Sequence, residues 1–200
     1  MIHEMPDETT FNYACGFGDL YREKLQFVEA VWWYRRAIHQ GHAGAQYRLG
    51  GLYEVGQGVP QNDTEAVRLV RLAAERGHVE AQYYLGIMYQ WGRCVERNGA
   101  EAVSWYRRAA EQGHVWAQNR LAGAYYVGKG VERDFVRAFM WYTVVKMADA
   151  GEMLSSSSRT QVERITNEMS ADQIAEAQRL AREWDEAHPR LPKFSFWSTS

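Results

Sequence analysis

Apolar residues along this chain follow helical spacing, in blocks that return at a fixed interval. Ala30, Trp33 and Ala37 lie three, four and seven residues apart, the spacing of one face of an α-helix. Equivalent residues recur every 36 positions. A second block, Gly-His followed by Ala-Gln, a leucine and a tyrosine, recurs with the same period. Two amphipathic helices within a fixed period of this length predict a solenoid of stacked helical pairs.

Each unit is expected to contain a helix A, a glycine-bearing loop and a helix B. Helix A is predicted over about 43–55, 79–91 and 115–127, and helix B over about 64–76, 100–112 and 136–148. The loop glycines allow helix A to end with positive φ, and the candidate caps of helix B are Asn62, Asp63, Asn98 and Asp134. Cys94 replaces the second loop glycine, so its loop is expected to be strained or to turn differently.

The repeated columns combine into the pattern GHxxAQxxLGxLYxxGxGVxxDxxxAxxWYRxAAEQ over about residues 27–150. This pattern resembles the Sel-1-like repeat family, a branch of the tetratricopeptide-like helical repeats. The resemblance implies an all-α fold, a right-handed α/α superhelix (solenoid) of about 36-residue helix-turn-helix repeats with a C-terminal capping helix.

We expect one solenoid domain. Its predicted parts are a degenerate N-terminal unit (11–41), three repeats (42–77, 78–113, 114–151), C-terminal capping helices (158–188) and an extended tail (189–200). The first unit's loop is four residues shorter than the others, and the tail either docks on the body or forms a loose, sticky end. Ser170–Gln173 is predicted to be a capping box that opens a helix, and Ser155–Ser158 a polar connector. Trp32, Trp33, Trp105 and Trp141 are expected in the core.

Charge and composition exclude some classes of partner. The net charge of −2 supplies no excess of cations to follow a phosphate backbone, so we expect no nucleic-acid partner. No apolar run is long enough to span a bilayer, and the first residues do not resemble an export signal. A cytoplasmic location is expected, or a periplasmic one if a signal was removed. Cys15 and Cys94 are expected to be reduced thiols.

Candidate chemistry is sparse. His42, His78 and His114 occupy one repeat position, but neighbouring repeats are roughly 8–10 Å apart, too far for one metal ion. They are therefore expected to bond the local turn at the helix start. No phosphate loop, metalloprotease motif or nucleophile elbow is present. We expect no enzyme, cofactor or metal. The alternative is a hydrolase acting in the groove, for which Glu80 is the acidic residue on the predicted wall.

The remaining side of helix A carries aromatic and arginine side chains, which are enriched at binding hot spots. The predicted partner-binding residues on this concave face, the helix-A face, are Tyr47, Arg48, Tyr83, Tyr84, Ile87, Trp91, Trp116, Asn119 and Arg120. We expect a scaffold or adaptor that binds a protein or peptide there. The resemblance implies bacterial roles in signalling, secretion or toxin immunity, and arginine outnumbers lysine nineteen to four, compatible with a GC-rich bacterial genome. We expect a monomer or weak homo-oligomer; the further alternative is a homo-oligomeric spacer.

Overall fold

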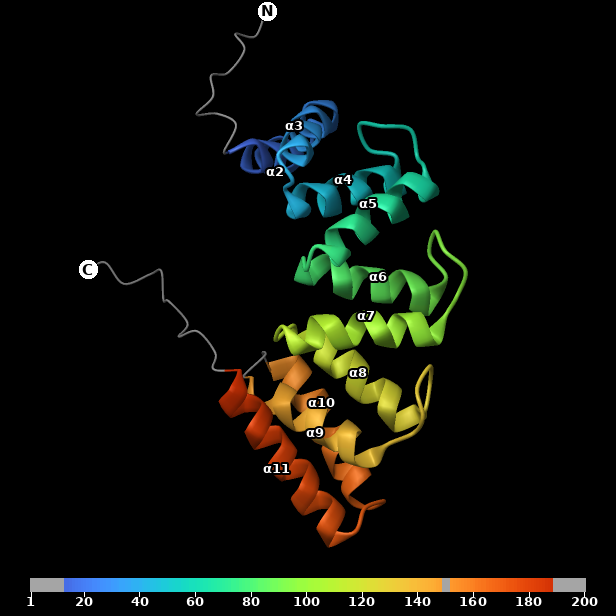
Figure 1. Ribbon diagram of the computed structural model, residues 1–200, viewed down its shortest axis with the longest axis vertical. Coiled ribbons are helices and arrows are strands. Elements are labelled where there is room, and N and C mark those ends of the chain that lie inside the picture. Colours follow the sequence, from blue (N-terminus) through green and yellow to red (C-terminus); the bar gives the residue numbers. More distant parts are fainter. Residues whose placement is uncertain (1–12, 149–151, 189–200) are drawn as a thin grey trace, which may run out of the picture. The chain divides into compact units, whose positions relative to one another are not determined.

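The computed structural model describes residues 13–148 and 152–188, and within this part of the chain all regular elements are α-helices. In chain order (Figure 1) these are α2 (Ala14–Glu23), α3 (Phe27–His39), α4 (Ala43–Val55), α5 (Asp63–Glu75), α6 (Val79–Trp91), α7 (Gly99–Glu111), α8 (Val115–Val127), α9 (Phe135–Met147), α10 (Glu152–Thr166) and α11 (Ala171–Ala187). The predicted all-α repeat fold is confirmed. Helix A has the predicted bounds in all three repeats, and helix B begins one residue earlier than predicted. No described helix is long and apolar enough to cross a membrane.

The chain divides into two compact units, residues 1–117 and 118–200, which we describe separately. In the first unit, α2 to α7 form consecutive helical pairs, and α4 also contacts both α2 and α6. The A helices of this unit therefore form a wall of neighbouring helices. The predicted short first loop is present, because only residues 24–26 separate α2 from α3, whereas residues 56–62 separate α4 from α5.

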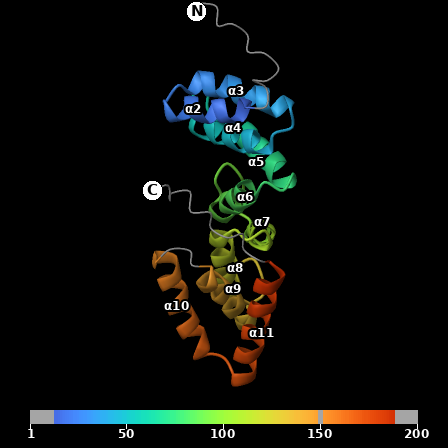
Figure 2. The same cartoon turned by 90° about the vertical axis from the view of Figure 1, so that its left-hand side faces the viewer.

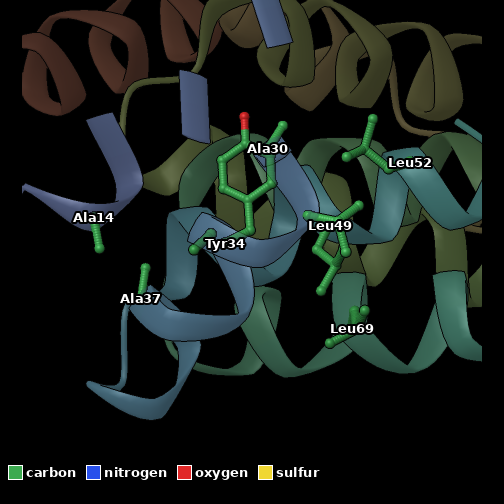
Figure 3. Close-up of a cluster of buried hydrophobic side chains, with 9 residues drawn as sticks. Ala14, Ala30, Tyr34, Ala37, Leu49, Leu52 and Leu69 are labelled. Carbon is green, nitrogen blue, oxygen red and sulfur yellow. The ribbon is translucent and has the colours of Figure 1, made fainter. Parts of the chain in front are cut away.

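Two apolar clusters hold the first unit together. The first contains Tyr34, Leu49 and Leu69, which are almost fully buried and come from α3, α4 and α5. Figure 3 shows Tyr34 and Leu49 within this cluster, beside the small side chain of Ala30. The second cluster centres on Leu85 and Met88 of α6. The small residues allow helices to approach closely, so that large side chains from both partners fill the space between them.

The same hydrogen bonds recur at each helix start. The Nδ1 atoms of His42, His78 and His114 accept bonds from backbone N–H groups three residues later at 3.2, 3.2 and 3.1 Å. Asn62, Asn98 and Asp134 cap the B helices in the same way, while Asp63 is the first residue inside α5. The expected role of the histidines at the helix start is confirmed, and so are three of the four candidate caps.

In the second unit, α10 and α11 both pack on α9 (Figure 2). Trp184 of α11 lies across Trp141 with their ring centroids 5.5 Å apart, and Ala177 and Ala181 are fully buried. The predicted capping box is present, since Ser170 and Gln173 exchange hydrogen bonds. These contacts bury the apolar side of α11 against α9.

Two predictions about local structure are wrong. Ser155–Ser158 is not a connector, because α10 begins at Glu152 and runs through it. Ser158 is completely buried, and such tertiary burial overrides the low helix propensity of serine. Trp32 is not in the core, because 47% of its surface is exposed. It belongs to the first described helical pair, where its ring centroid lies 5.1 Å from Arg36 and 4.7 Å from the ring centroid of Trp33, but it remains partly open to solvent. The predicted tail, 189–200, lies outside the described residues.

Candidate partner-binding surface

The predicted partner-binding residues differ in how far the chain itself covers them. Trp91 and Trp116 are 60% and 46% exposed, and Arg120 is also exposed. Those that are partly buried are Tyr47, Arg48, Tyr83, Tyr84, Ile87 and Asn119. The first unit contains all of them except Asn119 and Arg120, which belong to the second. Within the first unit the helix-A face therefore combines exposed tryptophans with half-covered tyrosines.

Two of the half-covered tyrosines contact the next repeat. Tyr47 lies against His78 with ring centroids 5.4 Å apart, and Tyr83 stacks on His114 at 4.5 Å. Burial lowers the pKa of both histidines, and the nearby carboxylate of Glu80 partly opposes this shift. Each tyrosine thus helps to shield the capping histidine of the following helix. In the second unit, the side chain of Asn119 lies 3.5 Å from the hydroxyl of Ser158.

Tyr84 belongs to a polar cluster that the sequence did not reveal. Its hydroxyl donates to the buried carboxylate of Glu54, which also accepts a bond from Arg93 at 2.6 Å. Burial, and secondly the hydrogen bond to Glu54, raise the pKa of Tyr84 well above its usual value. The repeat pattern does not mark Glu54, because its equivalents in the next two repeats are Gln90 and Tyr126. A substitution of Tyr84 would therefore disturb the fold as well as the surface.

The helix-A face of the first unit is hollowed by a cavity of about 480 Å³. Its cationic and tyrosine side chains are Arg22 from α2, Tyr47 and Arg48 from α4, and Tyr84 from α6. Its apolar lining includes Leu25, Phe27 and Leu52. Three predicted residues are thus brought together. The sequence analysis did not predict Arg22 and Leu25. It assigned the helix-A face from positions that recur in the three full repeats, and the degenerate first unit matches few of these positions.

Glu80 does not have the environment that the hydrolase alternative requires. Its side chain is 61% exposed and lies 3.5 Å from Nδ1 of His78, which caps the same helix. A catalytic carboxylate needs burial or a close partner to move its pKa towards neutrality. Among the described residues, no group of three histidine, cysteine or acidic side chains is placed to hold a metal ion.

Cys94 adopts the backbone conformation of the glycine that it replaces. Its φ of +57° matches the +70° of Gly58 and the +76° of Gly130, so the loop turns as in the other repeats and accepts the strain of a side chain in the left-handed region. The thiol also donates to Asp63. Burial and this carboxylate raise the pKa of Cys94 to about 11.

Replacing Asp63 with Asn is expected to speed alkylation of Cys94. Loss of the carboxylate lowers the thiol pKa, and each unit of decrease gives roughly tenfold more thiolate, the reactive form. We expect iodoacetamide to react roughly two- to tenfold faster at pH 9 in a Cys15→Ser background. Glu65→Gln is the matched control, because Glu65 also lies in the first turn of α5 but pairs with Arg68. Equal rates for the two variants would contradict the assigned contact.

The stacked helical pairs and their repeated caps define an α-solenoid built from short helix-turn-helix repeats. The Sel1 repeat profile matches residues 10–42, 43–78, 79–114 and 117–143, and the chain belongs to the Sel1 repeat family. Sel1 repeats are generally protein–protein interaction modules.

Two solved structures show the same architecture. A Sel1 repeat protein from Oxalobacter formigenes is 29% identical with a TM-score of 0.71, over 90% of this chain and 76% of that one. The second is c5321, a protective antigen present in uropathogenic Escherichia coli strains that displays an SLR fold. It is 27% identical with a TM-score of 0.58, over 95% of this chain. The chain spans about half the length of the E. coli protein. No curated protein matches the sequence.

Proposed function

We propose that this protein is a non-enzymatic scaffold or adaptor that binds a partner protein or peptide on the helix-A face of its first unit. The observation that carries the proposal is the cavity, which opens among aromatic and arginine side chains of three A helices. Trp91 and Trp116 add exposed aromatic surface on the same class of helix. Repeat arrays use such extended surfaces for recognition, and tryptophan, tyrosine and arginine supply most binding energy at interfaces.

The family resemblance extends this proposal to particular roles. A cytoplasmic bacterial adaptor in signalling or secretion, or an immunity protein that occupies a toxin, would each use the helix-A face to hold a folded or extended partner. Asn119 and Arg120, in the second unit, remain proposed contact residues for such a partner.

Site-specific photocrosslinking in the native cell tests the proposal. A benzophenone amino acid at Trp91 or Trp116 is expected to capture a partner protein, which mass spectrometry identifies. Trp32 is the matched control, because it is a tryptophan of similar exposure on a B helix, α3. Capture from Trp32 alone, or only of other copies of this chain, would contradict the proposed face.

Loss of the two exposed tryptophans is then expected to lower the affinity for the captured partner strongly. Truncating one hot-spot residue costs about 2 kcal/mol or more of binding free energy, so Trp91→Ala with Trp116→Ala should weaken the complex by at least about tenfold. Titration calorimetry measures this change. Thermal melting should differ little from the wild type, because both side chains are exposed. Unchanged affinity would exclude both tryptophans from the interface.

A second candidate function, a homo-oligomeric spacer, is favoured by one feature. Val28 and Trp32 are 67% and 47% exposed and lie one turn apart on α3. Burial of such a pair between copies would be favourable. Sedimentation of the wild type beside Trp32→Ala tests this: micromolar self-association that the variant loses would support the spacer, and a strict monomer would remove it.

A further inference from the structure

The cavity of the first unit has an unbalanced charge. Among the described residues, its lining contains Arg22 and Arg48 but no acidic side chain. The carboxylate of Glu54, which is buried, already accepts bonds from the cavity residue Tyr84 and from Arg93. The cavity therefore combines a cationic lining with an apolar one, which is formed by Leu25, Phe27 and Leu52.

We propose that this cavity binds a peptide segment of the partner in which a carboxylate side chain stands next to an apolar one. The inference rests on the proposed function and adds the chemistry of the partner. The carboxylate would pair with Arg22 and Arg48, and the apolar side chain would lie on Leu25 and its neighbours. Guanidinium groups suit this role, since they bind carboxylates through two parallel hydrogen bonds.

The carboxylate of Asp19 pairs with Arg48, one of the two cavity arginines. Asp19 lies 2.8 Å from Nε of Arg48, as an ion pair without the alignment of a hydrogen bond. It also accepts a bond from the buried hydroxyl of Tyr34 at 2.7 Å. Arg22 neighbours the same hydroxyl and makes no ion pair within the described residues. Within the described residues Arg48 thus has an ion-pair partner and Arg22 has none, which leaves the positive charge of Arg22 for a ligand.

The Nε atom of Arg22 carries this argument further. It is buried and has no hydrogen-bond partner among the described residues. A buried donor without an acceptor is costly in a folded protein, and bonds to charged groups are the strongest replacement. Arg22 lines the cavity, so a rotation of its side chain would present the buried Nε to a carboxylate that enters, and this carboxylate would supply the missing acceptor.

Leu25 supplies the apolar contact at a cost to the fold. Its φ is +58°, a conformation that is uncommon for residues other than glycine, and 73% of its surface is exposed. Within the described chain, Leu25 therefore has a strained backbone, and little burial of its side chain offsets that strain. Such strain is concentrated at ligand-binding positions, and a partner's apolar side chain would cover this leucine.

Peptide titration followed by NMR tests the inference. The probe is acetyl-Gly-Ser-Leu-Glu-Leu-Ser-Gly-amide, added up to about 10 mM to the ¹⁵N-labelled full chain, a range that detects weak complexes. We expect the Nε–H signal of Arg22 to move, and the peptide with Gln in place of Glu to bind roughly tenfold more weakly. No movement, or equal binding of the two peptides, would overturn the proposal. A larger response of Arg22 to inorganic phosphate than to the peptide would assign the cavity to phosphate instead.

Three variants complete the test. Arg22→Gln is expected to weaken the Glu peptide roughly tenfold, whereas Arg97→Gln, the same change at an exposed loop residue of the unit, should leave binding unchanged. Leu25→Gly should relieve the strained backbone, so that the protein melts at the same or a higher temperature while it binds the peptide more weakly. Wild-type binding by both Arg22→Gln and Leu25→Gly would overturn the proposal.

The photocrosslinked partner separates this inference from the proposed function. A partner that Arg22→Gln retains at full affinity would overturn the carboxylate assignment and leave the scaffold proposal intact. Failure to capture any partner at Trp91 and Trp116 would instead count against the scaffold proposal, whatever the peptide titration shows.

Discussion

Replacing Gly50 with alanine is expected to lower the free energy of unfolding by about 1–3 kcal/mol, whereas the same change at Gly51 should raise it by up to about 1 kcal/mol. A Cβ at Gly50 would lie 2.8 Å from Cγ2 of Val70 and 3.0 Å from the carbonyl oxygen of Ala66. At Gly51 it would meet no atom within 4 Å. One variant forces α4 and α5 apart, and the other only improves helix propensity.

The two glycines are matched controls for each other, because they are adjacent and lie in the same helix, α4. Urea denaturation followed by circular dichroism measures both changes, as shifts of the midpoint in opposite directions. A higher midpoint for both variants would show that helix propensity, and not the close approach of α5, determines the role of Gly50.

Acidification from pH 7 to pH 5 is expected to destabilise the first unit through His78 and His114. Both rings cap a helix through a deprotonated Nδ1, and burial lowers their pKa below the ordinary value of about 6.5. Between the two values the unfolded chain binds more protons than the folded one. The contribution of the two histidines to the free energy of unfolding is therefore complete above about pH 6.5. It is lost as the pH falls towards their folded-state pKa.

The charges around these histidines modulate the effect. Glu80 raises the pKa of both rings, and for His78 the neighbouring Arg48 and His42 lower it. A cap contributes about 1 kcal/mol, so loss of both should cost about 2 kcal/mol of unfolding free energy. Urea titrations at a series of pH values measure this loss.

Asparagine offers a cap that does not titrate. The double variant His78→Asn, His114→Asn should keep wild-type stability at pH 7 and lose less of it at pH 5. His39→Asn is the control, because His39 is an exposed residue in the last turn of α3 and caps no helix start. A pH dependence that survives in the double variant would assign acid sensitivity to other groups.

The sequence by itself determined the features that arise from local contacts. The helix-A boundaries follow from a histidine that bonds a backbone N–H three residues on and a glycine with positive φ at the other end, as at His42 and Gly56. The histidine cap and the glycine each act within one turn of their own helix, so both residue types recur at a fixed position in every repeat. The type of residue on the helix-A face was predictable for the same reason, because helical periodicity assigns each position to a side.

Only the tertiary structure decided which of those side chains are exposed and what surrounds them. Tyr47 and Tyr83 partly shield histidines of the next repeat, and Ser158 is helical because it is buried in the second unit. The cavity joins Arg22 to Arg48 across two helices, and Glu54 meets Arg93 from a later loop. These contacts depend on how residues far apart in the sequence pack against each other. Most of them differ from repeat to repeat, so they produce no recurring pattern in the sequence.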